Sequence, residues 1–105
     1  METTSIPNLT RNEIRQILRK HLPAMTARYG VVRLGIFGSY VRKEQTPTSD
    51  LDLLVEIENP QLTLLQFIEL QHYLSDLLGV EVDLVERETL KPQIGARILQ
   101  EVEYA

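Results

Sequence analysis

The sequence predicts a small α/β domain with a three-stranded mixed sheet and helices packed on one face of that sheet. Short apolar segments of strand length, rich in β-branched residues, recur at residues 31–37, 51–57 and 80–85. Longer segments in which apolar residues recur at helical spacing precede, separate and follow them. A chain of 105 residues suffices for one modest core, so we expect residues 1–105 to form a single domain.

The first helix is expected to begin after Thr10. Thr10 and Glu13 have the spacing of a capping box, in which the backbone and side chain at each position hydrogen-bond to the other. The apolar residues that follow at helical spacing are Ile14, Ile17, Leu18 and Leu22. Pro23 is expected to kink or restart the helix, and Gly30 to end it.

The next segments alternate between strand and turn. Residues 31–37 are apolar and β-branched, which predicts a buried strand. Residues 39–42 are expected to form a helical turn and residues 43–48 a polar loop. Residues 51–57 then form a second strand whose first five positions are apolar except for Asp52. A carboxylate in an otherwise buried strand indicates a functional position.

The second half of the chain predicts a long helix, a strand and a final helix. Residues 62–78 form the long helix, which Gly79 ends. Its inward-facing candidates include Leu65, Ile68, Leu74 and Leu78. Residues 80–85 alternate strictly, so that Asp83 lies on the face opposite the apolar residues. A last helix is expected from about residue 90 to residue 102.

The composition disfavours several classes of protein. With 11 Lys and Arg against 15 Asp and Glu, the net charge of −4 lacks the basic excess of a nucleic-acid binder, so no direct nucleic-acid partner is expected. An acidic chain could instead dock on a basic protein surface. No apolar run reaches membrane-spanning length and residues 1–8 lack a signal-peptide pattern, which predicts a cytoplasmic protein with no membrane partner.

A Gly-Ser turn followed by paired aspartates is the most informative pattern in the chain. Gly38 and Ser39 leave the first strand, and Asp50 and Asp52 follow about ten residues later. Residues two apart on a strand share a face, and two carboxylates held that close repel unless a cation lies between them. The turn could bind a phosphate through its N–H groups and the Ser39 hydroxyl. Alone, an Asp-x-Asp pair is usually solvated and a Gly-Ser pair is an ordinary turn.

Asp83 is the third candidate acid. If its strand pairs with the strand of Asp52, the two carboxylates can lie side by side, and three carboxylates suit phosphoryl transfer with two metal ions. By itself, Asp83 is more typical of a solvated strand position than of a catalytic one.

The quoted segments resemble the G-S-x(about ten)-D-x-D signature of the nucleotidyltransferases related to DNA polymerase beta. More narrowly, the chain is similar to the minimal nucleotidyltransferase (MNT) antitoxins, which act beside a HEPN-domain ribonuclease toxin. The resemblance covers residues 34–42, 49–55 and 80–85. It implies that the catalytic residues are Asp50, Asp52 and Asp83. It also implies that these three residues bind the cofactor, magnesium, as two ions.

The same resemblance implies that ATP is the substrate. The residues of this chain that would bind the nucleotide are Gly38, Ser39, Arg42 and Ser49. From its place in the chain alone, Arg42 is equally suited to a surface ion pair. Lys43 departs from the family pattern, which most often has Gly after this Arg, and its side chain could alter the loop or add a phosphate contact.

The leading hypothesis from the resemblance is an antitoxin enzyme. It would transfer AMP from ATP to a hydroxyl, most often a tyrosine, of a cognate HEPN toxin, and could form a hetero-oligomer with that toxin. Two alternatives stay open. One is a non-catalytic antitoxin that neutralises the toxin by binding it. The other is the catalytic subunit of a small-molecule, aminoglycoside-type nucleotidyltransferase.

Overall fold

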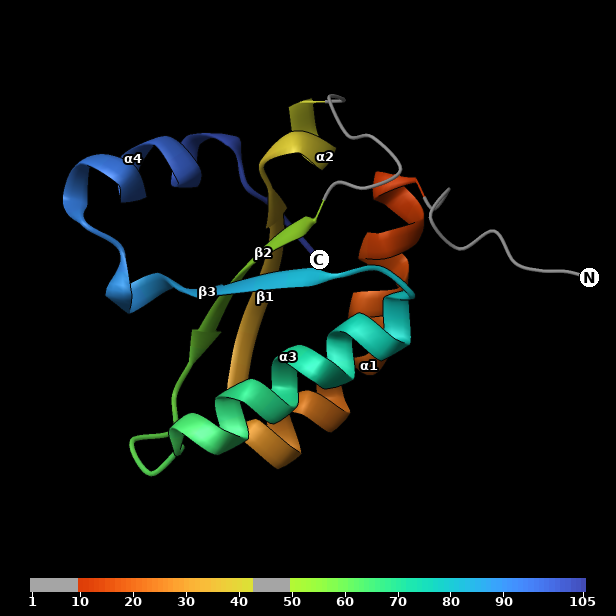
Figure 1. Ribbon diagram of the computed structural model, residues 1–105, viewed down its shortest axis with the longest axis vertical. Coiled ribbons are helices and arrows are strands. Elements are labelled where there is room, and N and C mark those ends of the chain that lie inside the picture. The colour runs from red at the N-terminus through yellow and green to blue at the C-terminus, as the bar shows by residue number, and fades with distance from the viewer. Residues whose placement is uncertain (1–9, 43–49) are drawn as a thin grey trace, which may run out of the picture.

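The computed structural model describes residues 10–42 and 50–105 (Figure 1). Its elements, in chain order, are α1 (Arg11–Tyr29), β1 (Val31–Phe37), α2 (Ser39–Arg42), β2 (Leu51–Ile57), α3 (Leu64–Leu78), β3 (Val82–Glu86), the short 3-10 helix η2 (Arg87–Thr89), α4 (Pro92–Glu101) and β4 (Glu103–Tyr104). No helix within these residues is long and apolar enough to cross a membrane.

The sheet is mixed, as predicted, with the strand order β3-β2-β1-β4 among the described residues. β1 pairs antiparallel with β2 and with β4, whereas β3 pairs parallel with β2. The sequence predicts three strands, and the fourth is the two-residue β4. A strand that short has no alternating pattern of its own, and only its pairing with β1 defines it.

Helices α1 and α3 pack on one face of the sheet, where they enclose the core, as the sequence predicts (Figure 1). Leu51 and Leu53 belong to this core, so Asp52 between them points to the opposite face. Helix α4 lines a cavity together with Asp52 and therefore lies on that opposite face. The prediction that the helices pack on one face thus holds for α1 and α3, and α4 is the exception.

Helix α1 begins and ends where its sequence predicts. Thr10 caps it, with both hydrogen bonds of the capping box to Glu13 present, and Gly30 ends it in the left-handed conformation at φ 79°. Pro23 lies inside the helix, which continues for 19 residues without restarting. Pro23 and Arg19 are both exposed, so water can bind the Arg19 carbonyl that lacks its helical donor.

Helix α3 departs from the predicted inward face. It begins at Leu64 because Thr63 caps it. Its buried residues are Leu70, Leu74 and Leu78. This confirms the last two of the four candidates, but Leu65 is 78% exposed and Ile68 is 39% exposed, so their assignment to the core was wrong. The buried residues recur every four positions along one narrow stripe, and Leu65 and Ile68 lie outside it.

Candidate active site

Asp52 and Asp83 are brought side by side by the pairing of β2 with β3. The parallel register sets Asp52 directly opposite Asp83, in neighbouring strands that run roughly 4.8 Å apart. The residues that flank both aspartates in sequence are buried, namely Leu51, Leu53, Val82 and Leu84. Both carboxylates therefore project from the face opposite the core, and the strand pairing on which this depended is confirmed.

Gly38 packs directly against the Asp52 carboxylate. It follows β1 with a φ of 81°, a backbone conformation that L side chains rarely adopt. A Cβ atom on Gly38 would overlap the Asp52 carboxylate and would lie 3.0 Å from its Cγ. Glycine is therefore required here for two reasons, the backbone conformation and the close approach of Asp52.

The turn that begins at Gly38 is anchored to the rest of the fold. The Val41 N–H donates to the Gly38 carbonyl at 3.1 Å, and the Arg11 guanidinium donates to the Val41 carbonyl at 3.0 Å. Tyr40 is 4% exposed within the core, and burial raises the pKa of its phenol. These contacts attach the turn to α1 and to the core.

The remaining predicted site residues lie at the edge of the described structure. Asp50 is exposed and immediately precedes β2. The backbone of Ser39 and Arg42 forms the ends of α2, but their side chains lie outside what the structure describes. Ser49 and Lys43 also lie outside the described residues. The structure therefore brings together Gly38, Asp52 and Asp83.

The donor set of the site suits magnesium. Within residues 10–42 and 50–105, no three His, Cys, Asp or Glu side chains form a group that could hold a metal by themselves. Magnesium, however, retains several waters and binds through one or two carboxylates together with the phosphates of its substrate. The carboxylates of Asp52 and Asp83, which the strand register sets side by side, fit that mode.

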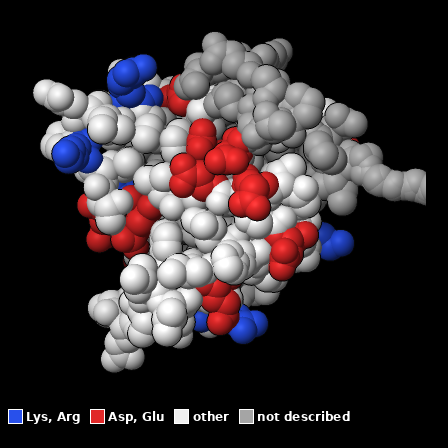
Figure 2. Space-filling model, in the orientation of Figure 1, with Lys and Arg blue, Asp and Glu red and all other residues white. Residues whose placement is uncertain are grey.

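One face of the molecule carries a group of acidic side chains. Figure 2 shows acidic side chains gathered over the middle of one face, whereas the Lys and Arg side chains lie toward the rim. Negative charge of this kind favours binding of a cation and opposes binding of a free nucleotide. A nucleotide is therefore expected to bind with its phosphates neutralised by a metal or by arginine.

Helix α4 contributes residues that the sequence reasoning missed. It closes a cavity of about 250 Å³, which is lined by Phe37, Gly38, Asp52, Ile94, Arg97, Ile98 and Glu101. The Gly38 N–H donates to Glu101 Oε2 at 2.7 Å. The sequence shows that Ile94, Arg97, Ile98 and Glu101 share one face of a helix. The sequence does not show that this face contacts Gly38, because Gly38 and Glu101 are 63 positions apart.

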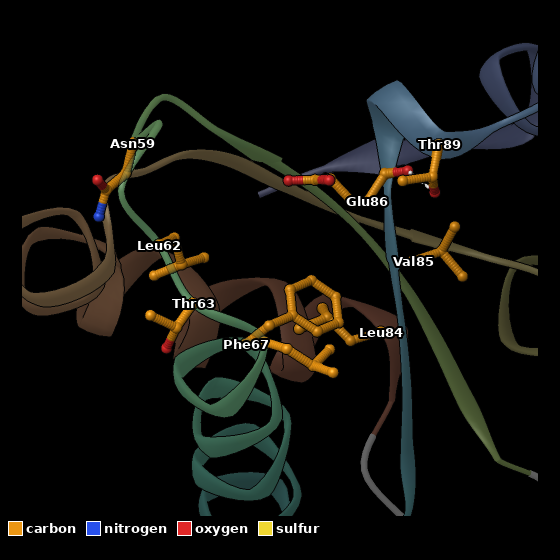
Figure 3. A pocket seen from close by; sticks show the side chains of 9 residues that line it. Asn59, Leu62, Thr63, Phe67, Leu84, Val85, Glu86 and Thr89 are labelled. Carbon is orange, nitrogen blue, oxygen red and sulfur yellow. Dashed lines mark hydrogen bonds between the residues drawn. The ribbon is translucent and has the colours of Figure 1, made fainter.

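A second, larger cavity lies at the start of α3. It measures about 500 Å³ and is lined by Asn59, Leu62, Thr63, Leu64, Phe67, Leu84, Val85, Glu86 and Thr89 (Figure 3). Figure 3 shows apolar side chains from α3 and β3 along one side, with Glu86 and Thr89 at the β3 end. Glu86 is the one acidic side chain among the described residues that line it, so these residues lack the paired carboxylates that phosphoryl transfer needs. The smaller cavity beside Gly38 and Asp52 is the better candidate active site.

Comparisons with known proteins show a family that matches most of the chain. The model of the nucleotidyltransferase domain family matches residues 13–105. The protein adenylyltransferase MntA of Thermococcus cleftensis is 48% identical over 96 residues, which cover 91% of this chain and 96% of that protein.

Solved structures share the fold. One, provisionally described as a minimal nucleotidyltransferase, is 38% identical with a TM-score of 0.74 and covers 91% of this chain and 96% of its own. A toxin–antitoxin complex crystallised with AMP-PNP contains a chain that is 25% identical with a TM-score of 0.66. That match covers 91% of this chain and 72% of the other.

Proposed function

We propose a protein adenylyltransferase activity for this chain, which belongs to the nucleotidyltransferase domain family. In this proposal it is an antitoxin that transfers AMP from ATP to a tyrosine hydroxyl on a cognate HEPN ribonuclease toxin. The modification neutralises the toxin. The observation that carries the proposal is the contact of Gly38 with Asp52, which is itself in register with Asp83, so that the turn and the acids form one site.

The reaction is an in-line displacement at the α-phosphorus of ATP. The acceptor oxygen forms a bond to that phosphorus, the bond to the oxygen bridging the α- and β-phosphates breaks, and pyrophosphate leaves. The acceptor hydroxyl loses its proton, which Asp83, exposed at the site, can accept. Catalysis then depends chiefly on positioning and on stabilisation of charge.

Each group of the site has a place in this reaction. The N–H groups of the turn at Gly38, with the Ser39 hydroxyl, hold the departing phosphates. Arg42 and Ser49 add further nucleotide contacts. Asp50, Asp52 and Asp83 would hold magnesium, most simply as two ions, and bound magnesium would neutralise the triphosphate charge.

A protein acceptor suits the exposure of the acidic residues of the site. Asp50 and Asp83 are both exposed, so the surface of a partner can reach the reacting groups. The relative named MntA is a protein adenylyltransferase, and the complex with AMP-PNP is a toxin–antitoxin pair. These names support a toxin as the acceptor for this chain.

The test is the intact mass of the cognate HEPN toxin after incubation with this chain, ATP and magnesium. We expect a mass gain of one or more AMP units, and no gain with the Asp50→Ala, Asp52→Ala double variant. Asp76→Ala, a change of an exposed aspartate on α3 away from the site, is the matched control and should act like the unchanged chain. A stable complex without any mass gain would refute the enzymatic proposal and favour neutralisation by binding.

A further inference from the structure

The Glu101 side chain accepts a hydrogen bond from the backbone N–H of Gly38. The proposed function assigns that same N–H to a phosphate of ATP. The distance from Glu101 Oε2 to the Gly38 nitrogen is 2.7 Å. Gly38 is buried, and Glu101 also lines the cavity that contains Asp52. A carboxylate oxygen and a phosphate oxygen are both anionic acceptors, and both form charge-assisted hydrogen bonds with a backbone N–H. One amide hydrogen cannot serve both at full strength.

The pairing of β4 with β1 brings the end of α4 close to the turn at Gly38. It sets Tyr104 opposite Gly35 and Glu103 opposite Ile36. Glu101, the last residue of α4, precedes Glu103 by two residues, and Gly38 follows Ile36 by two. The absence of a side chain at Gly35 permits this close approach, because a Cβ atom there would overlap Val102 and lie 3.1 Å from Tyr104 Cδ1.

The segment that follows Glu101 is firmly attached to the fold. Arg11 forms an ion pair with Glu103 at 3.1 Å, and Arg15 donates a hydrogen bond to the Tyr104 carbonyl at 3.2 Å. The Ala105 N–H donates to the Leu34 carbonyl at 2.8 Å. Arg33 also stacks on the Tyr104 ring, 4.3 Å from its centroid. The backbone of Glu101 is therefore held in place, and only rotation of its side chain can release the Gly38 amide.

Arg97 offers Glu101 a position away from that amide. The two residues are four apart on α4, where side chains are neighbours and opposite charges attract. Both line the same cavity. A Glu101 side chain turned toward Arg97 would leave the Gly38 N–H available to a phosphate.

We propose that Glu101 is a built-in competitor of the nucleotide. In the free chain its carboxylate binds the Gly38 amide, and nucleotide binding requires its side chain to rotate away. This inference rests on the proposed function, because it assumes that Gly38 binds the phosphates of ATP. Its consequence is that the native chain binds nucleotide more weakly than a chain without the Glu101 charge.

The test is calorimetric binding of AMP-PNP with magnesium to the full chain and to Glu101→Gln. Glutamine has the same shape and still accepts from the Gly38 N–H, so the fold is kept, but the neutral bond is about half as strong. We expect the Kd to fall about five-fold in Glu101→Gln, from the difference between charged and neutral hydrogen bonds. Glu88→Gln removes the same charge from an exposed position in η2 and should leave the Kd unchanged.

Thermal unfolding without nucleotide separates competition from a structural role. As a competitor, Glu101 stabilises the free chain, so Glu101→Gln and Glu101→Ala should lower the Tm while they tighten AMP-PNP binding. If both variants bind AMP-PNP no more tightly than the unchanged chain, the competitor role is refuted and the proposed function stands. If neither the unchanged chain nor Glu101→Gln binds AMP-PNP, the proposed function fails, and the competitor role fails with it.

Discussion

Substitution of Gly38 by alanine is the sharpest test of the site geometry. The residue has a φ of 81°, and its Cα lies against the Asp52 carboxylate. A left-handed conformation costs a non-glycine residue roughly 1–2 kcal/mol. The new methyl group would also overlap Asp52 Oδ2 and lie 3.2 Å from Asp52 Cβ, so the carboxylate must move.

The two costs affect different measurements. Backbone strain and displacement of a half-buried side chain should lower the free energy of unfolding by about 2 kcal/mol in Gly38→Ala. Displacement of Asp52 by about 1 Å should lower kcat/KM for AMP transfer by about 100-fold, because positioning dominates this chemistry. Urea unfolding measures the first effect, and the rate of toxin modification measures the second.

Gly79→Ala is the matched control for backbone strain. Gly79 has a similar φ of 71° and is the residue that ends α3. The Gly79→Ala variant should lose a similar free energy of unfolding from backbone strain, and its rate of AMP transfer should be unchanged. Equal transfer rates in Gly38→Ala and Gly79→Ala would refute the argument that Gly38 positions Asp52.

Three further predictions concern Asp83, the buried face of α3 and the phenol of Tyr29. Asp83→Asn should lower the rate of AMP transfer by about 100-fold and leave urea unfolding unchanged, because the side chain is exposed and acts only in the site; a normal rate would remove Asp83 from the mechanism. Leu74→Ala should cost about 2–5 kcal/mol in urea unfolding and Leu65→Ala less than about 0.5 kcal/mol, since the first is fully buried and the second is 78% exposed; similar losses would contradict the observed face of α3. Burial and a 2.6 Å hydrogen bond to Glu69 raise the pKa of Tyr29 above its ordinary value of 10.0. The stability from this phenol is therefore complete below about pH 10 and is lost as pH rises through the higher folded-state pKa. Urea unfolding between about pH 9 and 11 should show a shallower decline in Tyr29→Phe, and parallel curves would count against the raised pKa.

The local features of this chain were predictable because neighbouring residues determine them. The capping box of Thr10 with Glu13 and the terminal Gly30 define the ends of α1 through hydrogen bonds within one turn. Strict alternation placed Asp83 on the face away from the core, since a strand has a period of two. The position of Asp52 between apolar residues of a strand predicted that its side chain lies on the same face, away from the core. Asp52 and Asp83 therefore lie on the face of the sheet that the sequence predicted.

Tertiary structure alone decided which surfaces meet. The parallel register of β2 with β3, which makes Asp52 and Asp83 direct neighbours, depends on how two distant strands pack against the helices. The position of α4 over the site, and so the contact of Glu101 with Gly38, depends on β4 pairing with β1. A periodic pattern tells which side of an element is apolar. It does not tell which partner covers that side, because that choice minimises the free energy of the whole packed chain and not of one segment.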